Sequence, residues 1–317
     1  MKTYLDCVPC FFRQALESSR RSGASKKTQK KVLDALVKTI PEISLKSSPP
    51  EMARVIHQQL RRITKKKDPY LKIKRQSNKI ALGIYGKLKR RVTNSRNKLL
   101  TAVELAIAGN IIDYGAKNSL NIEAELARIL NEENKVIREE SKVIFDYDKF
   151  RSNLQRAETI LYLADNAGET VFDRILIEEI KRADSNKKII YAVKESPAIN
   201  DALKEDAVAC GLDKVAQVIS SGSDAPGTIL SLCSKNFLKI YRKADMVISK
   251  GQGNFEALSP PRRPVFFMFM VKCAVIAKVA GCNMGNIVLL YRTPKGKAGS
   301  ESVRHKKISR KSITAKV

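Results

Sequence analysis

The hydrophobic pattern of this chain changes its period near residue 155, and that change limits the folds open to it. From there to residue 291, short runs rich in β-branched and aromatic residues alternate with stretches of helical spacing. The runs are TILYLAD (159–165), KKIIYAV (187–193), VAQVIS (215–220), DMVIS (245–249), PVFFMF (264–269) and NIVLLY (286–291). Alternating strands and helices pack as a mostly parallel sheet covered by helices. The sequence therefore predicts a three-layer α/β/α domain over residues 153–295.

Residues 1–152 carry the helical period instead. Apolar residues recur there every three to four positions, in candidate helices that cover 10–23, 25–40, 48–63, 68–92 and 99–115. Asp68, which precedes Pro69, and Thr101 are the expected N-caps of the last two helices. We therefore expect an α/β protein in which an N-terminal all-helical domain, 1–152, packs on the C-terminal α/β/α domain. Residues 296–317 are basic and rich in serine, which predicts a disordered tail.

The chain is strongly basic, since 60 Lys and Arg against 32 Asp and Glu give a net charge of +28. Such a field attracts anions, including nucleic acids, acidic membrane surfaces and phosphorylated substrates. The charge is dispersed, because the tail contributes only +6 of it. Aromatic residues make up 6% of the chain and Trp is missing, which argues against base-stacking platforms. Nucleic-acid binding is therefore less favoured than a solvated basic surface.

Composition also bears on the compartment. The longest apolar stretch, 265–280, is interrupted by Lys272 and Lys278, so a membrane span is not expected. Asp6 breaks the apolar residues near the N-terminus, where a signal peptide would need an uninterrupted core. Six cysteines in 317 residues do not make a disulfide scaffold. These features predict a soluble, reduced, cytoplasmic protein and leave its oligomeric state open.

Polar residues and glycines follow the ends of the predicted strands. They are Asp165 and Asn166, Asn200 and Asp201, the segments 222–228 and 250–256, and Lys272. Each group alone is typical of a helix cap or a turn. Parallel strands, however, end at one edge of the sheet, where ligands bind. There the carboxylate and amide oxygens suit a hard divalent cation, and the lysines and N–H groups suit phosphate. The sequence thus predicts a metal-assisted phosphoryl site.

Several motifs occur in a specific order and spacing. They are DNAGE (165–169), PAINDA (197–202), GSDAPGT (222–228), ADMVISKGQGNFEAL (244–258) and KCAVIAKVAG (272–281). CVPCFFRQAL (7–16), DPYLKIK (68–74) and LLTAVELAIAGNIIDYG (99–115) precede them. Together, over residues 4–291, they resemble the metal-dependent damage-control phosphatase family, long catalogued as a domain of unknown function. The resemblance is to its stand-alone prokaryotic branch, which carries an N-terminal Cys pair.

The resemblance implies a divalent metal ion, manganese, nickel, cobalt or magnesium, in a cleft between the two domains. Carried over to this sequence, the implied metal ligands are Asp165, Asn166 and Asp201. Lys250 and Lys272 match basic catalytic positions near the substrate phosphate. The implied substrate-binding residues are Asn110, Asp113, Gly251, Asn254 and Glu256.

The family hydrolyses phosphate monoesters of small metabolites, such as sugar phosphates or damaged phosphometabolites, so the resemblance implies that activity and that partner. Asp165 is expected either to hold the metal or to attack the phosphorus as a nucleophile, and the sequence does not separate the two. An animal relative has been proposed to methylate protein carboxylates, which makes a carboxyl methyltransferase one alternative. The positive charge makes a non-enzymatic nucleic-acid-binding protein the other.

The cysteines add a separate question. Cys7 and Cys10 form a C-x-x-C motif at the entrance of the first predicted helix. They are expected to be buried structural thiols, part of a structural metal site with Cys273 and one more ligand, or a redox pair. A thioredoxin-type redox pair needs a preceding strand, and none fits before residue 7. The chain has only two histidines, so histidine-based catalysis is not expected.

Overall fold

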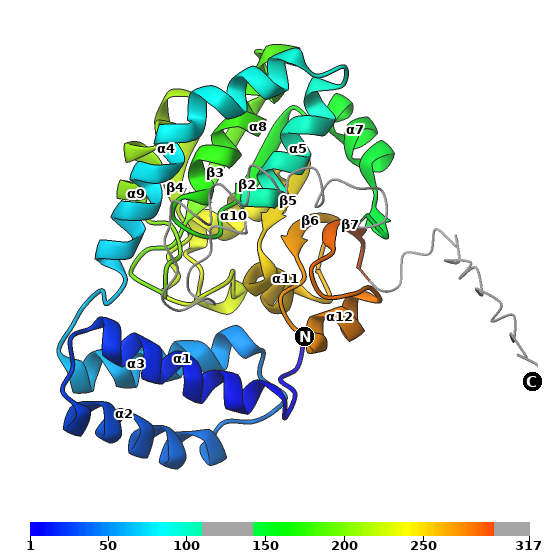
Figure 1. Cartoon of the computed structure of the whole chain (residues 1–317). Helices are drawn as coiled ribbons and strands as arrows, with labels where there is room; N and C mark the ends of the chain where they lie inside the picture. The colour runs from blue at the N-terminus through cyan, green and yellow to red at the C-terminus, as the bar shows by residue number, and fades with distance from the viewer. Residues whose placement is uncertain (110–141, 295–317) are drawn as a thin grey trace, which may run out of the picture.

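The structure is a computed structural model, and it describes residues 1–109 and 142–294. Within these two ranges, a seven-stranded sheet covered by helices forms the larger part, and a unit of three helices lies below it in the view of Figure 1. The tail and the predicted substrate-binding residues Asn110 and Asp113 lie outside the described residues. Within the described ranges, no helix is long and apolar enough to cross a membrane.

Six strands of the sheet are the predicted ones. They are β2 (Thr159–Leu163), β3 (Lys188–Val193), β4 (Gln217–Ser220), β5 (Met246–Lys250), β6 (Val265–Met270) and β7 (Ile287–Arg292). The seventh strand is β1 (Ile144–Phe145). The strand order is β1-β7-β6-β5-β2-β3-β4, and β6 with β7 is the one antiparallel pair among these described strands. The prediction of a mostly parallel sheet is confirmed.

The antiparallel pair follows from the connection between its strands. The short helix α12 (Ala274–Ala280) does not carry the chain back along the sheet, so β7 enters at the edge where β6 ends and Met270 pairs with Ile287. The sequence did not predict β1 (Ile144–Phe145), which pairs in parallel with β7. Two residues are too few to show a strand period.

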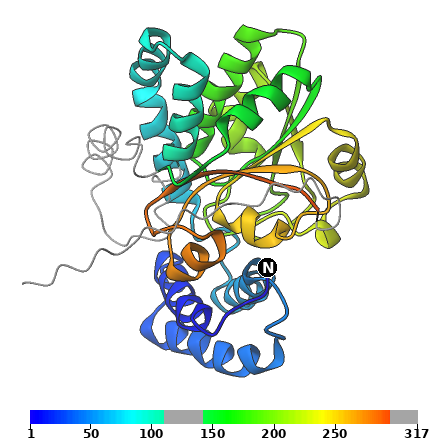
Figure 2. The ribbon, with the colours of Figure 1, turned by 90° about the vertical axis from the view of Figure 1, so that its right-hand side faces the viewer.

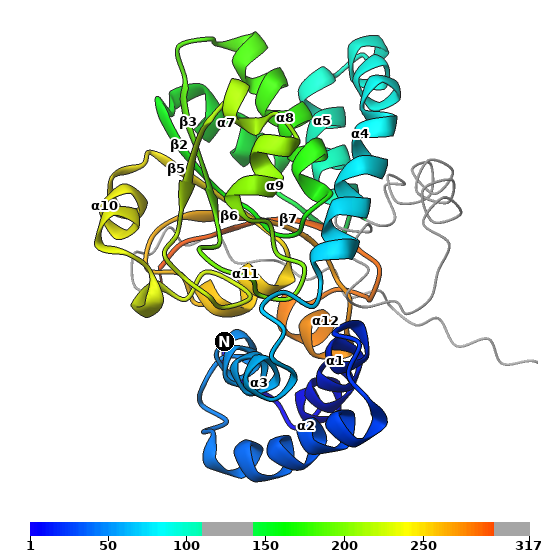
Figure 3. The same ribbon diagram turned by 90° about the vertical axis from the view of Figure 1, so that its left-hand side faces the viewer.

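Helices cover both faces of the sheet, which confirms the three-layer architecture (Figure 3). Because successive strand residues point to opposite faces, alternate residues belong to different cores. One core includes residues of α4 (Leu71–Asn94), α5 (Lys98–Ala108), α7 (Tyr147–Arg156), α8 (Glu169–Ala183) and α9 (Lys204–Ala209). The other includes residues of α10 (Lys235–Lys243), α11 (Gln252–Leu258) and α12.

The helices before residue 152 divide between two cores. The three-helix unit, α1 (Cys7–Arg21), α2 (Lys26–Thr39) and α3 (Pro49–Thr64), has a small core of its own. The sequence analysis placed α4 and α5 in the same helical domain, but their buried faces pack on α8 and join the core of the sheet. An amphipathic pattern shows that a helix has a buried face, but not which partner covers it. The domain boundary at residue 152 stays a prediction.

Two predicted N-caps are wrong. Asp68 accepts a hydrogen bond from the N–H of Tyr70 at 2.8 Å, which forms a turn ahead of α4 and delays its start to Leu71. For α5, the side chain of Asn97 accepts from the N–H of Leu100 at 3.1 Å, and Thr101 lies inside the helix. Asn is among the best N-cap residues, so it takes the role.

The three-helix unit is docked on the sheet through α3, which contacts α11 (Figure 2). Arg54 forms an ion pair with Asp224, and Gln58 donates a hydrogen bond to the same carboxylate at 3.1 Å. Burial works against the charge of Asp224, but these donors outweigh it and lower its pKa. Arg61 donates to the carbonyl oxygen of Pro197 at 2.9 Å. The unit therefore rests on the loops that follow β3 and β4, at the carboxyl edge of the sheet.

Candidate active site

The loops after β2 and β3 are joined at the carboxyl edge of the sheet. Asn166 and Asp201 form an antiparallel bridge, and the N–H of Ala202 donates to the carbonyl oxygen of Asp165 at 2.8 Å. Asp165, Asn166 and Asp201 are 8%, 4% and 4% exposed. The structure thus brings the three predicted metal ligands together from two neighbouring strands.

The end of β5 closes against the same carboxylate. Gly251 has φ +83°, and a Cβ added to it would lie 1.9 Å from Oδ2 and 2.4 Å from Oδ1 of Asp165. Only glycine allows the backbone to come this close, and the left-handed φ also favours glycine. Gly251, predicted as a substrate-binding residue, therefore packs on the predicted metal ligand.

Lys250 is part of a buried network behind these loops. Its Nζ donates to Glu169 Oε2 at 3.0 Å and to Asp173 Oδ1 at 2.8 Å, and all three side chains are fully buried. Asn166 Nδ2 donates to Glu169 Oε1 at 2.8 Å and to Asp165 Oδ2 at 3.0 Å. A continuous chain of polar contacts thus joins Asp173 to Asp165.

Two tyrosines complete the network from the sheet. Tyr162 and Tyr191 each donate a hydroxyl hydrogen bond to Asp173, both at 2.7 Å. Burial alone would lower the pKa of Lys250, but the carboxylates of Asp173 and Glu169 more than compensate and raise it above its ordinary value. The lysine is therefore held charged between two acidic groups.

The helix that follows Asp165 has an unusual start. The N-cap of α8 is Gly168, with φ 84°, and its N–H donates to Asn78 Oδ1 at 2.7 Å. Asn78 belongs to α4 and donates in turn to Asp206 at 2.7 Å. Asn166 is therefore not the cap of α8, and its amide nitrogen faces carboxylates instead. This orientation presents the amide carbonyl oxygen as the group for a cation.

Lys194 is a basic residue at this edge that the sequence analysis did not single out. It follows β3, its side chain is 3% exposed, and its Nζ lies 3.4 Å from Asp201 Oδ2 and 3.4 Å from Asn254 Oδ1. Its position directly after a buried strand was the available signal. Asn254, predicted to bind substrate, is fully buried and also bonds to Thr228, Ala164 and Lys250.

Gln252 connects the site to a second group of residues. Its Oε1 accepts from the N–H of Lys272 at 3.1 Å, and its Nε2 donates to Glu256 Oε1 at 2.9 Å. Burial raises the pKa of Glu169, and Lys250 and Lys272 oppose the rise. Lys272 also opposes the rise at Glu256, where burial brings the pKa to about 7. Lys272 thus lies within electrostatic range of both carboxylates.

The cysteines of the N-terminal motif lie at the joint between the three-helix unit and the sheet. Cys7 is half-buried and Cys10 is exposed, so the expectation of buried structural thiols is wrong for Cys10. Partial desolvation raises the pKa of both thiols, and Cys273 adds to the rise. Within residues 1–109 and 142–294, no three His, Cys, Asp or Glu side chains form a group that could hold a metal. A thiol-bound metal at Cys7 and Cys10 stays a prediction.

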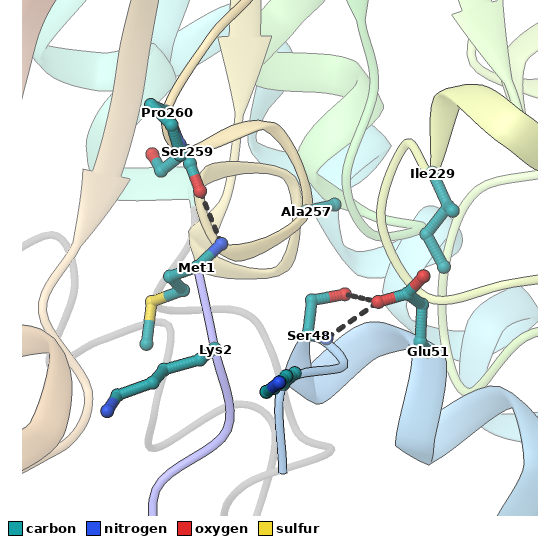
Figure 4. A pocket seen from close by; sticks show the side chains of 9 residues that line it. Met1, Lys2, Ser48, Glu51, Ile229, Ala257, Ser259 and Pro260 are labelled. Atoms are coloured by element: carbon teal, nitrogen blue, oxygen red, sulfur yellow. Dashed lines mark hydrogen bonds between the residues drawn. The ribbon is translucent and has the colours of Figure 1, made fainter. Parts of the chain in front are cut away.

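A hollow of about 350 Å³ lies beside Met1, between the start of α3 and the residues that follow α11 (Figure 4). Its lining includes Lys2, Ser48 and Glu51, and the Met1 amino group donates to the carbonyl oxygens of Glu256 and Ser259. Glu51 accepts from the N–H and hydroxyl of Ser48, which fixes the start of α3. None of the predicted site residues within 1–109 and 142–294 lines this hollow.

The donor set fits a hard cation. Asp165, Asn166 and Asp201 offer oxygen atoms, the ligand type that Mg²⁺ and Mn²⁺ prefer. The set holds two carboxylates and an amide. It is therefore not one of the groups of three His, Cys, Asp or Glu side chains considered above. Two carboxylates taken out of water are costly unless positive charge is near, and Lys194 Nζ supplies such a charge 3.4 Å from Asp201 Oδ2.

The fold and the candidate site define an open-sheet α/β protein with buried carboxylate and amide groups gathered at the carboxyl ends of β2, β3 and β5. The chain belongs to the damage-control phosphatase ARMT1-like domain family, whose model matches residues 3–288. It is 36% identical to the uncharacterized protein MJ0202 of Methanocaldococcus jannaschii, over 90% of this chain and 94% of the relative. It is 32% identical to the damage-control phosphatase PH1575 of Pyrococcus horikoshii, over 92% and 98% of the two chains.

A solved structure agrees with this assignment. The crystal structure of the DUF89 family protein PH1575 from Pyrococcus horikoshii superposes with a TM-score of 0.82 at 30% identity. The match covers 92% of this chain and 100% of that one. The resemblance to the damage-control phosphatase family and the fold class are therefore both confirmed.

Proposed function

We propose that this protein is a metal-dependent phosphatase that hydrolyses phosphate monoesters of small metabolites, such as sugar phosphates or damaged phosphometabolites. The observation that carries the proposal is the bridge between Asn166 and Asp201, which gathers oxygen donors from two strand ends. Membership in a family of damage-control phosphatases supports the same reaction.

Asp165, Asn166 and Asp201 would hold one divalent cation, manganese, nickel, cobalt or magnesium. Such a cation, when bound, polarises a phosphoryl oxygen and lowers the pKa of water. We assign Asp165 as a ligand, because Gly251 packs on its carboxylate and Asn166 donates to its Oδ2. These contacts fix the direction of its remaining oxygen lone pairs.

The lysines have different tasks in this proposal. Lys194 and Lys272 bring positive charge to the carboxyl edge and would stabilise the charge that develops on the transferred phosphoryl group. Lys250 is fully buried between Glu169 and Asp173, so we assign it to the support of Asn166. Lys250 thus acts as a positioning residue, in place of the phosphate contact that the resemblance implied.

Hydrolysis of p-nitrophenyl phosphate, with each divalent cation in turn, tests the proposal. Loss of a residue that only hydrogen-bonds to a metal ligand typically costs about 10- to 100-fold in activity. Asp165→Ala and Asp201→Ala should lower metal-stimulated turnover by more than that. Asp213→Ala, at an exposed position, is the matched control. A folded Asp201→Ala variant with full activity would refute the ligand assignment. A wild-type protein that hydrolyses no phosphate monoester with any cation would refute the function.

A further inference from the structure

The helix α4 has an extreme charge distribution. Its 24 residues include eight Lys and Arg and neither Asp nor Glu. It runs along the outside of the molecule, with its other face against α8 and α5 (Figures 1 and 3). The chain as a whole has about one acidic residue for every two basic ones, so its composition alone does not account for a helix with eight cations and no carboxylate.

Some of these cations serve the fold. Lys74 is buried and pairs with Asp68 at 2.8 Å, and Lys89 pairs with Glu178. Five others are exposed and form no ion pair with a described residue. They are Lys72, Arg75, Lys79, Lys87 and Arg90, and we call them the α4 basic face.

The five cations lie on one side of the helix. At 3.6 residues per turn they fall within a sector of about 120°. They form two groups, at 72–79 and at 87–90, and the step from Lys79 to Lys87 is about 12 Å at 1.5 Å per residue. This distance is close to the width of the major groove of B-form DNA, about 12 Å.

Two glycines occupy the space between the groups. Gly83 and Gly86 lie on the same side of α4 and are exposed. A Cβ on Gly83 would meet no atom within 4 Å, and one on Gly86 would meet only the guanidinium of Arg90 at 3.9 Å. The packing of the fold therefore does not require glycine there, although glycine is unfavourable inside a helix. Small residues at this point let an outside molecule approach the helix backbone.

We propose that the α4 basic face binds the phosphate backbone of double-stranded DNA. The two cation groups would meet phosphates on the two sides of a major groove, with Gly83 and Gly86 facing the groove. Contacts of this kind position a protein without reading the sequence. The low aromatic content argues against base stacking but does not oppose binding to the phosphate backbone, which needs no aromatic side chains. The inference concerns a surface apart from the candidate active site and does not depend on the phosphatase activity.

Fluorescence anisotropy with a labelled DNA duplex of about 20 base pairs, over a series of salt concentrations, tests the proposal. The test variant carries Lys72→Gln, Arg75→Gln, Lys79→Gln, Lys87→Gln and Arg90→Gln. The control carries Lys26→Gln, Lys27→Gln, Lys30→Gln, Lys31→Gln and Lys38→Gln, all exposed on α2. Each variant lowers the net charge by five, from +28 to +23.

The α4 variant should bind about 100-fold more weakly near physiological salt, and the salt slope should fall by about 4 to 5. The α2 variant should stay within about threefold of the wild type, because it loses only long-range attraction. The double variant Lys79→Gln, Lys87→Gln should show an intermediate loss, and it serves if the fivefold variant folds poorly. Melting temperature and turnover of p-nitrophenyl phosphate report the fold of every variant separately from binding.

Three results would overturn the proposal. One is an equal loss of affinity in the α2 and α4 variants, which would show that only net charge matters. Another is a wild-type protein that does not bind the duplex at physiological salt. The third is binding to vesicles of acidic phospholipid through the α4 basic face without binding to DNA. A failure of the phosphatase assay with intact DNA binding would leave this inference standing.

Discussion

Gly251 lies against the carboxylate of Asp165, so closely that a Cβ on residue 251 would come within 1.9 Å of Oδ2. The two residues follow the ends of neighbouring strands, β5 and β2. Their contact fixes the carboxylate from the side of the sheet, while Asn166 fixes it from its own loop. The position of Asp165 thus depends on a residue with no side chain.

We expect Gly251→Ala to abolish metal-stimulated phosphatase activity, because the new methyl group displaces the Asp165 carboxylate. Gly281→Ala is the control for a positive φ alone, since Gly281 has φ +82° and ψ 37° and a Cβ there would meet nothing within 4 Å. Its left-handed alanine should cost about 1 kcal/mol of stability, and Gly251→Ala should cost more, because φ 83° with ψ 159° is a conformation nearly restricted to glycine. Only Gly251→Ala should lose activity and metal affinity, measured by calorimetric titration. Equal activity in the two variants would contradict the role of this contact.

Lys250→Met should destabilise the protein by about 3 to 5 kcal/mol, because Glu169 and Asp173 lose their buried partner. Urea unfolding measures the loss. Tyr191→Phe should cost about 1 to 2 kcal/mol, since it removes one hydroxyl from Asp173. Tyr241→Phe is its control, because the buried Tyr241 hydroxyl has no hydrogen-bond partner among the described residues. Wild-type stability in Lys250→Met, with a lower kcat and unchanged metal affinity, would place Lys250 at the phosphate instead.

Lys194→Met separates two roles of a second buried lysine. If Lys194 contacts the phosphate, kcat/KM for p-nitrophenyl phosphate should fall by about 100-fold. The metal concentration for half-saturation should stay the same or fall, because Lys194 lies 3.4 Å from Asp201 and its charge opposes a cation there. A half-saturation point that rises with the loss of activity would show that Lys194 only orients Asp201. Lys187→Met, at a buried lysine bonded to the Ala157 carbonyl, is the control.

The strands were readable from the sequence because each buried run has the composition of a core strand. The antiparallel orientation of β7 could not be predicted from the sequence. It depends on which end of the sheet the chain has reached when it leaves the short helix α12. The assignment of α4 and α5 to the sheet was not readable either. Their apolar faces look the same whether they pack on a helix or on a sheet.

The proposed metal ligands could be predicted from the sequence, but the buried network that holds them in place could not. Asp165, Asn166 and Asp201 stand directly after strands, where chain position and chemistry both point to a ligand site. Glu169 and Asp173 lie four residues apart on α8, which is a common spacing of charges on an exposed helix face. Only the burial of both side chains shows that they hold Lys250.

Glu256 should make stability depend on pH. Burial raises its pKa from 4.5 to about 7, with the Met1 amino group and Lys272 facing the carboxylate. Between these pH values the folded protein keeps a proton that the unfolded chain has lost, so the free energy of unfolding falls as pH rises. Glu256→Gln should flatten this dependence in urea unfolding from pH 4.5 to 7. Glu205→Gln, at an exposed position, should leave the pH dependence of stability unchanged. An unchanged pH dependence in Glu256→Gln would contradict the role of the Glu256 carboxyl group.

The docking of α3 has a consequence for the order in which the protein is completed during translation. Arg61 bonds to Pro197, which is synthesised 136 residues later, and Arg54 bonds to Asp224, which is synthesised 170 residues later. The three-helix unit leaves the ribosome first with its own small core, but its docking surface is synthesised much later. A nascent chain that stops before Lys250 lacks the strand end that fixes Asp165. Truncated products should therefore be inactive, however well their first helices fold.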